Sequence, residues 1–74
     1  MEEEECKKMG AKIKYYRQLK DISQSKLAEN VGISAQYLSR IERGKQMPSV
    51  QVLMLIARKL GIDVGLLVSN LQVN

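Results

Sequence analysis

Several residue types that serve catalysis and metal binding are scarce or missing in this sequence. It has no histidine, tryptophan or phenylalanine, and one cysteine and one proline among its 74 residues. Without histidine the chain lacks the usual general base and the commonest metal ligand, so we expect no enzyme, metal site or cofactor. A lone cysteine excludes an internal disulfide and fits a reducing, cytoplasmic environment. No apolar run approaches the ~20 residues of a membrane span, so we expect no membrane contact.

The scarcity of turn-forming residues also bounds the fold. Five glycines and one proline leave little room for a strand-and-turn architecture, whereas 45% apolar residues suffice for a compact helical domain. A single core is marginal at this size, so either packing must be efficient or a second subunit must help.

Negative charge is concentrated at one end of the chain. Residues 2–5 are four of the eight acidic residues, so residues 6–74 carry twelve Lys or Arg against four Asp or Glu, a net of +8. A domain with so large a positive charge is suited to binding a polyanion such as nucleic acid. Charge taken by itself is explained equally well by solubility. We interpret residues 1–6 as an acidic, frayed N-terminal tail; alternatively, these acids stabilise the positive end of the first helix.

Apolar residues recur at helical spacing along most of the chain. Serines precede three of these segments and are candidate N-caps, while Gly44 and Gly61 can end helices in a left-handed conformation. We therefore predict an all-α, compact five-helix bundle over residues 7–68, with 69–74 as a C-terminal tail. The helices are expected at about 7–20, 24–30, 35–42, 49–60 and 63–68.

The segment from Gln24 to Arg43 has the spacing of a helix-turn-helix. Its fifth position, Ala28, must be small because two helix axes cross closely there, and its ninth, Gly32, can adopt positive φ. An ordinary helical hairpin also shows apolar periodicity, but it has no reason to meet these offsets while leaving Gln36 and Arg40 outward. Five further positions are apolar and would bury the inner faces of both helices: Leu27, Val31, Ile33, Leu38 and Ile41.

A longer pattern extends the helix-turn-helix over most of the chain. It comprises Ile13-Lys14-Tyr15-Tyr16-Arg17, Ile22-Ser23-Gln24, Leu27-Ala28, Val31-Gly32-Ile33-Ser34, Leu38-Ser39-Arg40-Ile41-Glu42-Arg43-Gly44, Pro48-Ser49 and Leu60-Gly61-Ile62. In this pattern the chain resembles the Cro and lambda-repressor-like family of helix-turn-helix transcriptional regulators. The resemblance implies a domain that binds double-stranded DNA as a homodimer on a pseudo-palindromic operator, with residues 35–42 in the major groove.

Two positions depart from the family pattern. Asp21 replaces the common glycine after the first helix, so we expect a mildly strained turn there. Ala35 stands where family members often have a polar base-reading residue, so one base contact is expected to be apolar or absent.

The candidate base-reading residues lie on the second helix of the motif. Gln36 and Arg40 are four residues apart and project from the same side. Glutamine can pair in a bidentate way with adenine, and arginine with guanine. Ala35 could contact a thymine methyl group, and Ser39 a base or a phosphate.

A second group of residues is expected to contact DNA phosphates. The resemblance assigns Gln24 to the backbone, and a helix N-terminus with an amide donor suits a phosphate on physical grounds. Arg43 and Lys45 follow the recognition helix, where family members have similar contacts. Tyr37 either packs or hydrogen-bonds to the backbone, and Lys14 is a further candidate.

Two charged residues are expected to have a structural role instead. The family pattern pairs Arg17 in the first helix with Glu42 near the end of the third. We interpret the two as an ion pair that orients the recognition helix.

The C-terminal segment is rich in apolar residues. Leu66 and Leu67 close the core or contact a second subunit, whereas Leu71 and Val73 favour a partner. We take Leu67, Leu71 and Val73 as candidates for a homodimer contact.

The sequence thus indicates a sequence-specific DNA-binding regulator, most simply a bacterial or phage repressor. Nothing in it indicates a small-molecule effector. The alternative is an antitoxin-like or other protein-interaction module with the same fold, which the apolar C-terminus and the Tyr15 and Leu19 pair motivate. That pair either extends the core edge or stays exposed on the surface.

Overall fold

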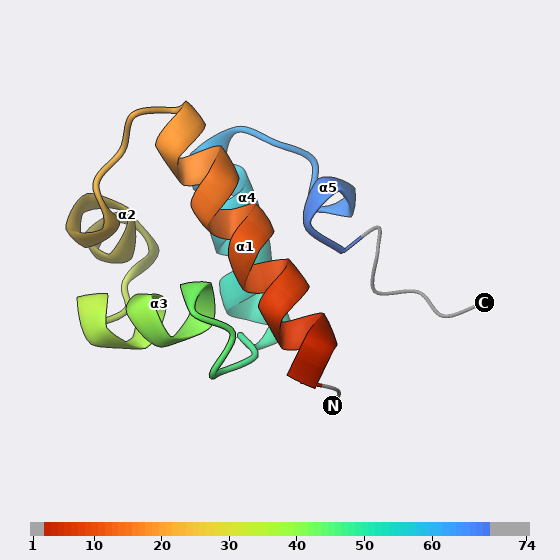
Figure 1. The fold of residues 1–74 in the computed structure, drawn as a ribbon. Helices are drawn as coiled ribbons and strands as arrows, with labels where there is room; N and C mark the ends of the chain where they lie inside the picture. The colour runs from red at the N-terminus through yellow and green to blue at the C-terminus, as the bar shows by residue number, and fades with distance from the viewer. Residues whose placement is uncertain (1–2, 69–74) are drawn as a thin grey trace.

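The computed structural model describes residues 3–68, which form five helices and no strand. The predicted all-α five-helix bundle is confirmed. In Figure 1, α1 and α4 run through the middle of the molecule, with α2 and α3 to one side and α5 to the other. No described helix is long and apolar enough to cross a membrane. The bounds are α1 Glu3–Leu19, α2 Gln24–Val31, α3 Ala35–Glu42, α4 Val50–Leu60 and α5 Gly65–Val68.

Helices α2, α3 and α4 begin close to where the sequence predicts because each has a serine N-cap. The hydroxyls of Ser23, Ser34 and Ser49 accept hydrogen bonds from the backbone N–H three residues later, at 3.0, 3.0 and 3.1 Å. Each bond satisfies a donor that the first helical turn leaves unpaired. Gly32 and Gly61 end α2 and α4 with φ of 84° and 69°, in the expected left-handed conformation.

The expected N-terminal tail is corrected by the structure, because α1 already begins at Glu3. Glu3, Glu4 and Glu5 occupy its first turn, where their negative charges stabilise the helix by interacting with the positive end of its dipole. The last helix is shorter than predicted. Asp63 does not start it; its Oδ1 accepts the Gly65 N–H at 2.8 Å, and α5 begins after that turn.

The core lies between α1, α3, α4 and the inner faces of α2 and α5. Leu67 is fully buried in it, which corrects its assignment as a dimer contact: a side chain with 0% exposure has no surface to offer a partner. The fully buried large side chains are Ile13, Leu27, Leu38, Ile41, Ile56, Leu60 and Leu67.

The turn between α1 and α2 contains the strained residue that the sequence predicts. Asp21 has φ of 59° and is the one non-glycine residue with positive φ among those described. Aspartate adopts this left-handed conformation more readily than most residues, but its conformational energy there is higher than that of glycine.

Helices α1 and α3 approach each other closely at Gly10, which is buried. A Cβ atom at Gly10 would lie 2.8 Å from the Glu42 carbonyl oxygen and still closer to the Ile41 carbonyl oxygen. Only a residue without a side chain lets the end of α3 rest on α1 in this way. The sequence did not single out this position.

Candidate nucleic-acid interface

The two helices of the motif are held together by a small residue and a glycine turn. Ala28 is buried, and its carbonyl oxygen accepts hydrogen bonds from the N–H groups of Gly32 at 2.9 Å and Ile33 at 3.0 Å. Leu27 on α2 and Leu38 and Ile41 on α3 are fully buried. These contacts fix α3 against the body and leave its opposite face in solvent.

The outward face of α3 carries the side chains that the sequence assigned to base reading. Ala35, Gln36 and Arg40 are exposed, and Ser39 is half-buried. Gln36 and Arg40 line one hollow of about 150 Å³ together with Ser34, Tyr37 and Gln46. Gln46 comes from the loop after α3, and sequence reasoning missed it because loop conformation carries no periodic signal.

Tyr37 is less accessible to a DNA phosphate than the exposed candidates are, because part of its side chain is buried. It is half-buried, and its side chain packs against the hydrophobic core. Packing was the alternative that the sequence left open for this residue, and the phosphate contact remains a prediction.

Two of the three basic candidates for phosphate contact, Arg43 and Lys45, lie at the C-terminal end of α3, whereas Lys14 belongs to α1. Lys14, Arg43 and Lys45 are all exposed. Arg43 is the C-cap of α3, and its N–H and Nε both donate to the Ser39 carbonyl oxygen, at 3.0 and 3.3 Å. The Lys45 N–H donates to the Arg40 carbonyl oxygen at 2.9 Å. Two of the three cations are therefore anchored by their backbone to the recognition helix.

Arg17 and Glu42 are brought together in a buried ion pair. Arg17 Nε lies 2.7 Å from Glu42 Oε2, and Nη2 donates to Oε1 at 3.1 Å, which makes the contact bidentate. Arg17 Nη1 donates to the Ile22 carbonyl oxygen at 2.8 Å. The two residues are 8% and 7% exposed. Because Glu42 ends α3 and Arg17 belongs to α1, the pair fixes the end of the recognition helix on the body.

Gln24 joins this network, which the sequence did not predict. Its Nε2 donates to Glu42 Oε1 at 3.0 Å, and the side chain is half-buried. A glutamine amide has a second N–H and an acceptor oxygen besides that bond. The residue expected to bind phosphate thus also connects the start of α2 to the end of α3.

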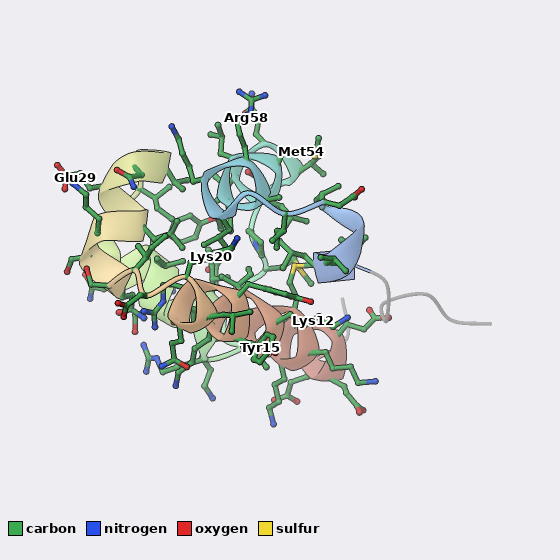
Figure 2. All side chains as sticks on the ribbon, turned by 90° about the horizontal axis from the view of Figure 1, so that it is seen from above. Lys12, Tyr15, Lys20, Glu29, Met54 and Arg58 are labelled. Atoms are coloured by element: carbon green, nitrogen blue, oxygen red, sulfur yellow. The ribbon has the colours of Figure 1, made fainter. Side chains whose placement is uncertain are left out.

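Exposed apolar side chains occur on three helices. Tyr15 and Leu19 on α1 are 58% and 62% exposed, so they do not extend the core. On α4, Val50 and Met54 are also exposed, and Figure 2 shows Met54 and Arg58 extending from α4 away from α1. Leu66 on α5 is exposed beside the buried Leu67. The other two dimer candidates, Leu71 and Val73, lie outside the described residues.

Groups that could hold a metal ion are absent from the described part of the chain, residues 3–68. Cys6 is a half-buried free cysteine on α1.

Comparison with known proteins agrees with this geometry. Residues 13–67 match the model of the helix-turn-helix family. The chain is 41% identical over 61 residues to the ImmF control region 10 kDa protein of Bacillus phage phi105, covering 82% of this chain and 68% of the phage protein. It is 43% identical over 63 residues to the HTH-type transcriptional regulator SinR of Bacillus subtilis, covering 84% of this chain and 57% of SinR.

A solved structure of the biofilm master regulator SinR in complex with DNA has the same fold. It matches with a TM-score of 0.77 at 43% identity, covering 81% of this chain and 97% of that chain. The family match, residues 13–67, contains the whole of α2 and α3.

Proposed function

We propose that this chain, which belongs to the Cro and lambda-repressor-like family of helix-turn-helix transcriptional regulators, represses transcription by binding a specific double-stranded DNA operator. The observation that carries the proposal is the pairing of Gln36 and Arg40 on the exposed face of α3, a helix that buried residues and an ion pair fix in place.

Base reading is assigned to the outward face of α3 in the major groove. Arg40 donates two hydrogen bonds to guanine O6 and N7, and Gln36 pairs with adenine N6 and N7. Both side chains line the same surface hollow as Gln46, so they can face neighbouring base pairs together. Ala35 offers a thymine methyl group an apolar contact, and Ser39 is a weaker candidate because it is half-buried.

Phosphate contacts fix the position of the domain on the duplex. Arg43 and Lys45 extend from the C-terminal end of α3 and supply salt-dependent affinity without reading sequence. Gln24 contributes from the N-terminus of α2, where backbone N–H groups and the helix dipole favour an anion. Lys14 and the hydroxyl of Tyr37 complete the proposed set.

We further propose that the protein binds as a homodimer in the cytoplasm. Two copies related by a two-fold axis would present two α3 helices to half-sites about one helical turn apart, roughly 34 Å, on a pseudo-palindromic operator. Leu71 and Val73 are the proposed contacts between the copies.

Selection of bound duplexes from a random pool tests the proposal. The expected result is convergence on one pseudo-palindrome, whose half-site spacing reports the dimer geometry. Recovery of unrelated sequences with equal affinity would show that binding rests on phosphates alone and would overturn the proposal.

A second candidate function is that of a protein-interaction module. The exposed Tyr15 and Leu19 on α1 favour it, because neither side chain is used by the core. It predicts a stoichiometric protein partner and no DNA binding even at low salt. DNA binding at low salt would contradict this second candidate as the main function and support the repressor.

A further inference from the structure

Helix α1 begins about three turns before the family match. The match begins at residue 13, whereas α1 begins at Glu3, so residues 3–12 add a helical extension ahead of it. None of residues 3–12 is among the residues expected from the sequence to contact DNA.

This extension touches the loop that follows the recognition helix. A Cβ atom at Gly44 would lie 2.7 Å from both Cα and Cγ of Lys7 and 3.1 Å from its backbone nitrogen. Gly44 has φ of 75° and connects Arg43 to Lys45, two of the proposed phosphate contacts. The stem of Lys7 therefore lies directly on the basic loop.

The same side of α1 continues toward the buried ion pair. Lys7, Gly10, Lys14 and Arg17 follow one another at spacings of three and four residues and so share one face of the helix. Gly10 and Arg17 on this face contact the end of α3. Lys7 and Lys14 flank Gly10 and are both exposed. In Figure 1, the N-terminal end of α1 and the loop after α3 lie together at the lower edge of the molecule.

We propose that Lys7 is an additional contact to a DNA backbone phosphate, so that the N-terminal extension of α1 lengthens the phosphate-binding surface formed by Lys14, Arg43 and Lys45. This inference rests on the proposed function and extends it beyond the part of the chain that matches the family. A lysine on a flexible stem acts as a point charge toward phosphate and adds affinity without reading sequence.

Glu3 allows a second test of the same surface, with the opposite charge. Glu3 lies one turn before Lys7 on the same face and is exposed. If this face borders the DNA backbone, a carboxylate there repels phosphates. Neutralising Lys7 and neutralising Glu3 should therefore change DNA affinity in opposite directions.

The experiment measures binding of the full-length protein to its selected operator, and to an unrelated duplex, at several salt concentrations. The variants are Lys7→Gln, Lys7→Arg and Glu3→Gln, with Arg58→Gln as the matched control. Arg58 is equally a surface cation, but it extends from α4 away from α1 (Figure 2). Circular dichroism of each variant verifies the helical fold, and Lys7→Arg retains the charge.

Lys7→Gln is expected to weaken binding to both duplexes several-fold and to lower the slope of log affinity against log salt by about 1. Lys7→Arg should bind like the wild type, and Glu3→Gln should bind more tightly. The inference is overturned if Lys7→Gln binds with the same affinity and salt slope as Arg58→Gln. That outcome leaves the proposed function intact, whereas a wild-type protein that binds neither duplex at low salt contradicts the proposed function itself.

Discussion

At the scale of single residues, Glu42 is the point where the polar contacts of three helices converge. Its carboxylate accepts hydrogen bonds from Arg17 at 2.7 and 3.1 Å and from Gln24 at 3.0 Å, although the residue is 7% exposed. A buried carboxylate requires such partners, because an unpaired charge away from water is costly. No buried side-chain nitrogen or oxygen lacks a partner among the described residues.

Removing one side of the ion pair should therefore destabilise the protein strongly. Glu42→Ala leaves the Arg17 guanidinium buried without a carboxylate, and we expect a loss of ~3 kcal/mol in the free energy of unfolding. The double variant Arg17→Met with Glu42→Met removes both charges and should recover much of that loss. Urea denaturation measures both variants. Equal losses in the single and double variants would mean that packing, rather than the unpaired charge, causes the effect.

At the scale of elements, the start of a helix was predictable where a serine caps it, and the start of α1, which lacks such a cap, was not. Ser23, Ser34 and Ser49 mark the starts of α2, α3 and α4 in the sequence, and each makes the expected hydrogen bond. The start of α1 has no such residue, so composition suggested a tail where the helix continues. The close approach at Gly10 was also invisible, because it depends on where the end of α3 lies in space.

For the substitution Gly10→Ala, helix propensity and packing predict opposite changes in stability. Helix propensity alone predicts that Gly10→Ala stabilises α1 by about 1 kcal/mol. The added methyl group would instead overlap the carbonyl oxygens of Ile41 and Glu42, and overpacking of this kind costs about 1–3 kcal/mol. We expect a lower thermal midpoint. Ala11→Gly on the exposed side of α1 serves as the propensity control, and stabilisation by Gly10→Ala would contradict the close packing of α1 on α3.

At the scale of the whole molecule, the sequence predicted which side chains of α3 are exposed better than it predicted the contacts between helices. The exposed positions of Gln36 and Arg40 follow from helical periodicity, so they were predictable. The bond from Gln24 to Glu42 and the position of Gln46 beside Arg40 depend on tertiary contacts, so they were not. Leu67 was misassigned because apolar composition does not distinguish a core residue from an interface residue.

The proposed homodimer contact makes a prediction at this scale. Leu71→Asp with Val73→Asp should convert a dimer into a monomer and weaken operator binding, because an aspartate is costly in an apolar interface. Sedimentation equilibrium measures the oligomeric state. Leu19→Asp, at an exposed apolar position on α1, is the control. A dimer that survives the double variant and is lost with Leu19→Asp would place the interface on α1.

The most direct measurement is the affinity of the wild type and of Arg40→Ala for the selected operator and for every single-base-pair substitution in one half-site. If Arg40 on the exposed face of α3 reads a guanine, the variant loses about 1–3 kcal/mol of operator affinity. It should also become indifferent to the base pair at one position while keeping its preferences elsewhere. Uniform weakening across all sequences, with every preference retained, would contradict base reading by Arg40 and identify it as a phosphate contact.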